Sequence, residues 1–292
     1  MKQDIQAENE RALKVAAFYL NFMSTRIKSE IMEELTDGDT SLNDLMYASM
    51  IACYSGLDLD DPCDKIIYNK YLIPMVKGLA AEEYREDPYY KKIKIPNETF
   101  GKWRLENKSY APYEAFVYDD LEVRYDGRLL PHIGYFTDTL EYPSVSENGR
   151  EWMTVTPNEI NTMKKAINSA RGNDLTLGLG LGYYAYMVSR KQEVKTVTVV
   201  ERDREVIELF EKFILPQFEN RDKIKIVCAD AFEFADTRLH DGEFDHVFTD
   251  LWHDASDGME LYQKMKGYEK SCPDTEFDYW IEKTIKIYLE DQ

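Results

Sequence analysis

Cysteine and histidine are scarce in this chain of 292 residues, which has four of each. The cysteines lie far apart and show neither the close pairs of a metal site nor the density of a disulfide scaffold. They are Cys53, Cys63, Cys228 and Cys272. We therefore expect reduced, mostly buried thiols and no bound metal.

A long apolar run is also missing. The first ten residues, MKQDIQAENE, have no apolar core of the kind that a signal peptide needs, and no later stretch is apolar for long enough to span a bilayer. Basic residues are outnumbered as well, because the formal net charge is -19 and the acids are spread along the chain. Such a surface repels nucleic-acid phosphates and anionic lipids. These absences predict a cytoplasmic protein that binds neither nucleic acid nor membrane.

The residues that are present are typical of a folded globule, with 43% hydrophobic and 13% aromatic residues. The length exceeds that of a typical single domain, so we expect more than one. Within residues 1–92, apolar side chains recur at every third or fourth position, first between Leu13 and Leu35 and again after Ser41 and after Asp61. This pattern predicts a helical N-terminal unit whose apolar faces serve in packing or in a homodimer.

The next segment, residues 93–153, changes to a period of two. Short alternating runs at 115–118, 121–125 and 133–136 are separated by Asp and Gly, which predicts antiparallel strands and a small β subdomain. Several aromatic residues and one histidine of this region either line a pocket or pack in the core. They are Trp103, Tyr110, Tyr113, His132 and Trp152.

The third segment, residues 154–292, begins with a strong helix-start signal. Thr156 can cap the helix, Pro157 suits its first position and Glu159 completes a capping box. The predicted helix runs to about Arg171 and precedes a predicted buried strand. The succession of helix and strand from here onward is typical of a parallel α/β sheet.

A glycine-rich stretch, DLTLGLGLGYYAYMVS at residues 174–189, follows that helix. Its apolar start predicts a buried strand, its glycines a turn and its end a helix. The glycines are Gly178, Gly180 and Gly182. Without side chains they let the backbone approach a ligand closely, and the helix start offers unpaired N–H groups to a carboxylate or phosphate. The stretch therefore predicts a nucleotide pocket.

Acidic residues end the next three predicted strands, at 196–200, 225–228 and 246–249. Glu201 is placed to accept hydrogen bonds from both hydroxyls of a ribose. Asp230 either accepts a hydrogen bond from an adenine amino group, with Ala231 beside the ring, or caps the helix that follows it. Asp250 reaches the same edge of the sheet, so three acids converge on one predicted pocket.

The glycines alone fit a dinucleotide or S-adenosylmethionine. A dinucleotide needs a second nucleotide-binding half, and only 42 residues follow Asp250. Most of them have a helical pattern, with Asp274 and Thr275 as caps of a final helix that includes Phe277 and Trp280. We therefore expect a Rossmann-like α/β sheet that is shortened after its fourth strand.

Together these motifs resemble those of class I S-adenosylmethionine-dependent methyltransferases. The resemblance covers roughly residues 156–266 and implies that the glycine turn holds the methionine portion of the cofactor, Glu201 the ribose and Asp230 the adenine. A β subdomain before such a sheet is also similar to the spermidine synthases, in which the aspartate after the fourth strand helps to deprotonate an amine. Asp250 matches that position.

The predicted chemistry follows from these positions. Methyl transfer is an in-line displacement, so the protein has to orient an acceptor and, for a weak nucleophile, remove a proton. Asp250 and His253, which lies in the loop after the fourth strand, are the catalytic candidates. We expect methyl transfer to a small-molecule acceptor, with aminopropyl transfer or a non-catalytic S-adenosylmethionine-binding protein as alternatives.

Overall fold

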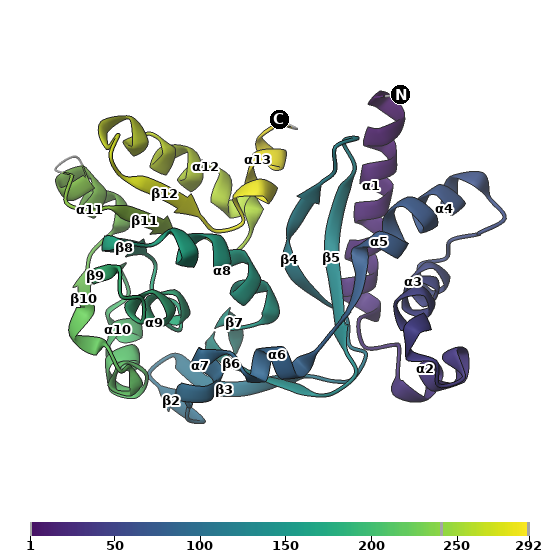
Figure 1. The fold of residues 1–292 in the computed structure, drawn as a ribbon, viewed down its shortest axis with the longest axis horizontal. Coiled ribbons are helices and arrows are strands. Elements are labelled where there is room, and N and C mark those ends of the chain that lie inside the picture. The colour runs from purple at the N-terminus through teal and green to yellow at the C-terminus, as the bar shows by residue number, and fades with distance from the viewer. Residues whose placement is uncertain (1, 240–241, 291–292) are drawn as a thin grey trace. The chain divides into compact units, whose positions relative to one another are not determined.

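The computed structural model describes residues 2–239 and 242–290, and its contacts group the chain into two compact units. Unit 1 comprises Met1–Arg85 and Ser109–Glu141, and unit 2 comprises Glu86–Lys108 and Tyr142–Gln292. Each unit is thus built from two separate stretches of chain (Figure 1). The sequence predicted three domains, at 1–92, 93–153 and 154–292, and whether these fold independently remains a prediction. The contacts of the folded chain group residues 109–141 with the N-terminal helices.

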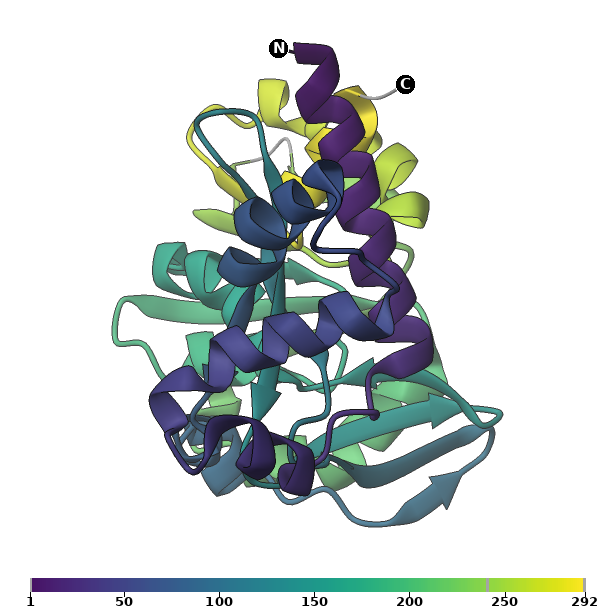
Figure 2. The ribbon, with the colours of Figure 1, turned by 90° about the vertical axis from the view of Figure 1, so that its right-hand side faces the viewer.

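Unit 1 surrounds a three-stranded sheet of order β1-β5-β4. Its strands are β1 (Val76–Leu79), β4 (Phe116–Val123) and β5 (Leu129–Phe136). Its helical elements are α1 (Lys2–Phe18), η1 (Tyr19–Met23), α2 (Ser29–Thr36), η2 (Thr40–Leu42), α3 (Asn43–Tyr54), α4 (Pro62–Ile67), η3 (Tyr68–Leu72), α5 (Ile73–Met75) and α6 (Ala81–Arg85). Helix α1 packs on β5 and α3 packs on β1 (Figure 2), so one core joins helices and strands.

The apolar recurrence between Leu13 and Leu35 predicts one long helix, but the structure divides this stretch. Helix α1 continues into the π-helical turn η1, and the chain then leaves helical geometry before α2. The carbonyl oxygen of Ser24 accepts a hydrogen bond from the Ala115 N–H (2.9 Å), so the break is used to join the helices to the β region. Apolar side chains recur at helical spacing on both sides of this break because α1 and α2 face the same core.

Unit 2 begins with α7 (Pro88–Lys92) and a four-stranded antiparallel arrangement of order β2-β3-β6-β7. These strands are β2 (Glu98–Phe100), β3 (Trp103–Tyr110), β6 (Leu140–Glu147) and β7 (Arg150–Thr154), and the ends of β3 and β6 reach into the 109–141 segment. Asn148 and Gly149 connect β6 and β7, both with positive φ (50° and 82°), as a two-residue hairpin requires.

The rest of unit 2 is a Rossmann-like parallel sheet of order β10-β9-β8-β11-β12. Its elements in chain order are α8 (Pro157–Ser169), β8 (Gly172–Leu177), α9 (Tyr183–Ser189), β9 (Val194–Glu201), α10 (Arg204–Phe213), η4 (Leu215–Gln217), η5 (Arg221–Lys223), β10 (Ile224–Cys228), α11 (Ala231–Arg238), β11 (His246–Thr249), α12 (Ala255–Lys266), η7 (Tyr268–Ser271), β12 (Glu276–Tyr279) and α13 (Glu282–Glu290). The strand order reverses between β8 and β11, which is where open α/β sheets bind ligands. The predicted α/β fold is confirmed.

The expected four-strand sheet has one strand more. Residues predicted to start a final helix instead form β12, which pairs in parallel with β11 through His246–Glu276 to Thr249–Tyr279, and a helix begins only at Glu282. These residues form a strand and not a helix because the edge of β11 is available for pairing, and Phe277 and Tyr279 occupy the strand positions beside it. The sheet ends after this fifth strand among the residues that the structure describes.

A buried polar cluster joins β8, β11 and β12. The His246 ring lies 2.7 Å (Nδ1) from Asp174 Oδ1 and 3.2 Å (Nε2) from Asp278 Oδ2. Tyr184 donates its hydroxyl proton to the same oxygen of Asp174 (3.0 Å), and Lys165 pairs with Asp278. Burial lowers the pKa of His246, but the hydrogen bonds and charges of the two carboxylates outweigh it and raise that pKa. The cluster therefore favours a charged imidazolium inside the sheet.

The cysteines are free, but the expectation that most are buried is wrong. Cys53, Cys63 and Cys228 are exposed and only Cys272 is buried, because the first three occupy outward positions of helices and of an edge strand. In the described part of the chain, no group of side chains is arranged to hold a metal ion. No helix within that part has the length and apolarity to cross a membrane.

Candidate active site

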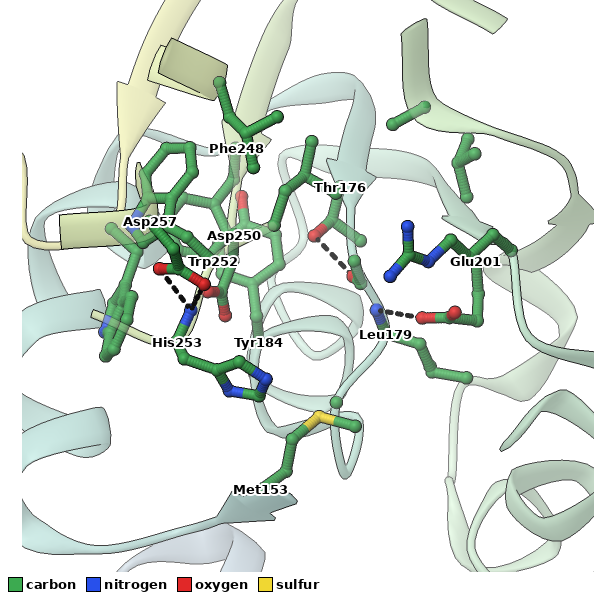
Figure 3. A pocket seen from close by; sticks show the side chains of 18 of the residues that line it. Met153, Thr176, Leu179, Tyr184, Glu201, Phe248, Asp250, Trp252, His253 and Asp257 are labelled. Atoms are coloured by element: carbon green, nitrogen blue, oxygen red, sulfur yellow. Dashed lines mark hydrogen bonds between the residues drawn. The ribbon is translucent and has the colours of Figure 1, made fainter. Parts of the chain in front are cut away.

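A cavity of about 1190 Å³ lies in unit 2 at the ends of β8, β9, β10 and β11. This volume exceeds the roughly 300–1,000 Å³ of most sites for one small ligand. Its walls come from β7, from the glycine turn, from the residues after each strand and from one side of α12 (Figure 3). The cavity can therefore hold a nucleotide cofactor together with a second molecule.

The glycine turn after β8 forms the floor of the cavity. Gly178 has φ +103°, and a Cβ at this residue would lie 2.0 Å from the backbone oxygen of Asp250. A Cβ at Gly180 would meet the sulfur of Met153 on β7 at 3.2 Å. These two glycines line the cavity, whereas Gly182 lies behind it against the ring of Phe210. The backbone of this turn therefore leaves no room for a side chain at Gly178 or at Gly182.

The carboxylate of Glu201 lies at the cavity wall after β9. It accepts hydrogen bonds from the backbone N–H of Leu179 (3.3 Å) and of Asp203 (2.8 Å). Burial raises the pKa of Glu201, and the hydrogen bonds oppose that rise. The side chain is thus held in one place beside the glycine turn, as a ribose acceptor requires, and its role remains a prediction.

The two alternatives for Asp230 are compatible in the structure. Its Oδ1 accepts hydrogen bonds from the N–H groups of Phe232 (2.8 Å) and Glu233 (3.2 Å), so the residue caps α11. Asp230 also lines the cavity, with Ala231 and Phe232 next to it. The cap orients the carboxylate at the cavity wall, and contact with an adenine remains a prediction.

Two carboxyl groups that line the cavity, those of Asp250 and Glu159, lie close enough to repel one another. Both are surrounded by protein but keep exposed surface toward the cavity. Burial raises the pKa of Asp250 to about 7. Burial and repulsion by Asp250 raise the pKa of Glu159 well above its ordinary value. The two groups titrate as a coupled pair whose pKa values both lie above those of exposed carboxyl groups.

The presence of Glu159 in the cavity corrects its predicted place in a capping box. Thr156 occupies the N-cap position and Pro157 the first turn of α8, as predicted, but the Thr156 side chain makes no capping hydrogen bond. Glu159 points into the cavity instead of back to the helix end. The Thr-Pro-x-Glu pattern could not reveal this because a carboxylate at the third helical position can turn either way.

His253 also borders the cavity, on the same side as Asp250 and opposite Glu201 (Figure 3). Its ring contacts the edge or face of Trp152 at right angles, with 4.3 Å between ring centroids. Its backbone N–H donates to the carboxylate of Asp257, which with Asp254 forms a true capping box at the start of α12. The loop is thereby fixed, and a catalytic role for His253 remains a prediction.

Aromatic side chains of the predicted β region divide between cavity and core. Trp152 lines the cavity, whereas Trp103 packs behind it with 5.8 Å between ring centroids. Tyr110, Tyr113 and His132 belong to unit 1 and line none of it. The sequence left both alternatives open for these residues; in the structure Trp152 lies on the edge strand β7, whose burial does not alternate along the strand.

Trp280 was missed as a site residue because the sequence placed it in a helix. It follows β12, donates its ring N–H to Thr162 Oγ1 on α8 (2.9 Å) and lines the cavity. The next residue, Ile281, has φ +45°, which is a strained conformation for a β-branched side chain. The strained turn lets the chain pass from β12 into α13 while the indole is held at the cavity wall.

Residues 156–270 match the spermine/spermidine synthase domain. The matched segment runs from the start of α8 to η7 and includes the glycine turn and every predicted cofactor-binding residue. The resemblance predicted from the motifs is therefore confirmed for this part of the chain. No curated protein matches.

Solved structures that resemble this chain include a spermidine synthase and an S-adenosylmethionine-dependent methyltransferase. Spermidine synthase from Thermotoga maritima is 17% identical, with 48% of this chain and 53% of that chain covered and a TM-score of 0.34. An S-adenosylmethionine-dependent methyltransferase from Agrobacterium tumefaciens is 16% identical, with 47% and 46% covered and a TM-score of 0.36. The chain spans about half the length of each of these proteins.

Proposed function

We propose that the spermine/spermidine synthase domain binds S-adenosylmethionine and transfers its methyl group to an acceptor amine. The observation that carries the proposal is the meeting of the glycine turn, Glu201 and the Asp250–Glu159 pair in one cavity. The cavity volume supports it, because a cofactor and an acceptor have to be bound side by side.

The residues present fit this cofactor. Gly178 and Gly180 leave the floor free of side chains, and Gly182 lets α9 pack closely behind it. Glu201 offers an oriented carboxylate to the ribose hydroxyls, while Asp230 and Ala231 border the space for the adenine. When bound, S-adenosylmethionine supplies a methyl group on a positively charged sulfur, which a nucleophile can displace.

The carboxyl pair would prepare the nucleophile. An amine is protonated near neutral pH and reacts only after losing a proton, and a base is most efficient when its pKa lies near the working pH. Asp250, with its pKa raised to about 7, has this property. The pKa of Glu159 is raised as well, which favours its protonated form as a hydrogen-bond donor beside Asp250. His253 lies at the same side and would orient the acceptor.

Aminopropyl transfer from decarboxylated S-adenosylmethionine is the second candidate, and the family match favours it. The same carboxyl pair would serve it, since an amine attacks in both reactions. A non-catalytic S-adenosylmethionine-binding protein is the third. The small-molecule acceptor, the homodimer, the cytoplasmic location and the lack of nucleic-acid and membrane partners expected from the sequence remain predictions.

Titration calorimetry with S-adenosylmethionine, its decarboxylated form and NAD separates these candidates. We expect S-adenosylmethionine to bind, and Glu201→Ala to weaken its binding by about 1.5 to 3 kcal/mol, or roughly 10- to 150-fold, because hydrogen bonds to a charged group are lost. Glu208→Ala, an exposed acid on α10 outside the cavity, is the control. Unchanged affinity in a folded Glu201 variant, or tighter binding of NAD, contradicts the proposal.

A further inference from the structure

Strand β7 presents its edge, and not only one face, to the cavity. Side chains alternate between the two faces of a sheet, so a strand that turned one face to a cavity would line it with every second residue. All residues from Arg150 to Val155 line the cavity. Strand β7 is the last strand of the order β2-β3-β6-β7, and within the described residues no strand pairs with its outer side.

The backbone groups of β7 alternate between β6 and this outer side. The Val155 N–H donates to the carbonyl oxygen of Pro143 on β6 (3.0 Å). In an antiparallel pair, the neighbouring residue then turns its N–H and C=O away from the partner strand. Thr154, which is paired opposite Ser144, is that residue. Its backbone donor and acceptor are therefore directed to the free edge at the cavity.

From this free edge we propose that the acceptor is an extended peptide, and not the small molecule expected from the sequence. The peptide pairs with β7 through its backbone and places a lysine or N-terminal amine at Asp250 and Glu159. The inference rests on the proposed function and names its substrate class. Strand addition to an exposed sheet edge is a general way to bind peptides, because the backbone supplies affinity and the side-chain pockets supply specificity.

The charge of the cavity favours a basic peptide. Seven acidic and three basic side chains line it, apart from His253. The acids are Glu151, Glu159, Glu201, Asp230, Asp250, Asp257 and Glu260, and the bases are Arg150, Arg202 and Lys264. The rings of Trp152 and Trp280 can cover the aliphatic part of a lysine while its ammonium group reaches the carboxyl pair.

Asp250, the amine and the cofactor account for every proton and electron pair in the methyl transfer. The amine loses a proton to the Asp250 carboxylate, and its lone pair forms a bond to the methyl carbon. The bond between that carbon and the sulfonium breaks, and its electron pair stays on sulfur, which becomes a neutral thioether. No oxidant, reductant or metal is needed.

The test uses affinity selection on the full chain saturated with S-adenosylhomocysteine. The probe is a mixture of acetylated pentapeptide amides with a central lysine and randomised flanks. A second mixture has N-methylated backbone nitrogens, and acetyl-lysine methylamide represents a small amine. We expect retention of the first mixture only. Equal retention of the N-methylated mixture, or binding of the small amine as tight as that of the peptides, overturns the inference.

A pair of proline variants isolates the strand edge. Thr154→Pro removes the outward N–H of β7 while leaving its bonds to β6, and should lower peptide retention at least 10-fold. Thr99→Pro is the matched control. Thr99 lies on β2, the opposite edge strand of the same sheet, one residue before the pair Phe100–Trp103 that closes its hairpin. This variant should retain peptides like the unmodified chain, and equal losses in both variants overturn the inference.

Cofactor binding distinguishes the failure of this inference from that of the proposed function. Both proline variants are measured by calorimetry with S-adenosylmethionine, which also reports that they are folded. Cofactor binding without peptide retention contradicts the peptide acceptor alone. Peptide retention without cofactor binding contradicts the proposed transfer and leaves β7 as a peptide-binding edge.

Discussion

The raised pKa of Asp250 predicts that this residue destabilises the folded chain above neutral pH. In the unfolded chain the carboxyl ionises near 3.8, and in the folded chain near 7. Between these values the folded state holds a proton that the unfolded state has lost, so stability falls as pH rises. Each pKa unit corresponds to about 1.4 kcal/mol, which makes the whole effect about 4 kcal/mol. Asp250→Asn cannot ionise and lacks this loss.

Thermal unfolding followed by circular dichroism from pH 4 to pH 8 provides the assay. The Tm difference between Asp250→Asn and the unmodified chain should increase with pH and level off above pH 7. A domain of this size shifts by about 2–4 °C per kcal/mol, so the increase should be roughly 10 °C. Glu208→Gln, an exposed acid on α10, corrects for the loss of one negative charge. A difference that is constant over this range, or that decreases with pH, would refute the reasoning.

Two further variants test the turn and the buried cluster. Gly178→Ala should abolish measurable cofactor binding and lower the Tm, because its Cβ would lie 2.0 Å from the Asp250 oxygen. The control is Gly38→Ala, at a residue with φ +78° but open space around it, which should show only backbone strain of about 1–3 kcal/mol. Equal effects of the two variants would contradict the steric explanation. His246→Gln should destabilise the chain by about 3–5 kcal/mol, because two buried carboxylates lose the charged group that they share and keep Tyr184 and Lys165. Since the folded pKa of His246 is raised, its stabilisation is complete below about pH 6.5 and is lost as pH rises through the folded value. The variant should therefore differ most from the unmodified chain in chemical denaturation near pH 6, and a difference that grows toward pH 9 would contradict a charged His246.

The sheet and the place of its ligand could be predicted from sequence because local chemistry defines them. A strand, a glycine turn and a helix have few other arrangements, and acids after consecutive parallel strands must meet at one edge. Gly178, Glu201, Asp230 and Asp250 accordingly line one cavity. Their separation in sequence did not matter, since the order of strand and helix fixes where each strand ends.

Features that depend on a distant partner could not be predicted in this way. Residues 276–279 form a strand because the edge of β11 is next to them, although their pattern also suits a helix. Glu159 has the local pattern of a capping residue, but the cavity side of α8 and the carboxylate of Asp250, 91 positions later in the sequence, decide its environment. Trp280 became a wall residue through a hydrogen bond to Thr162, which no spacing rule connects to it.

The alternation of the two compact units along the chain has a consequence for synthesis on the ribosome. Unit 1 is complete once residue 141 has emerged, but residues 86–108 belong to unit 2, whose parallel sheet is made last. At about 5–20 residues per second, β2 and β3 wait roughly 10–40 s for the rest of their unit. For about the first 2–9 s, until β6 and β7 have emerged, Trp103 has neither its neighbouring strand nor Trp152 to pack against, so this nascent segment is where a chaperone would have most to protect.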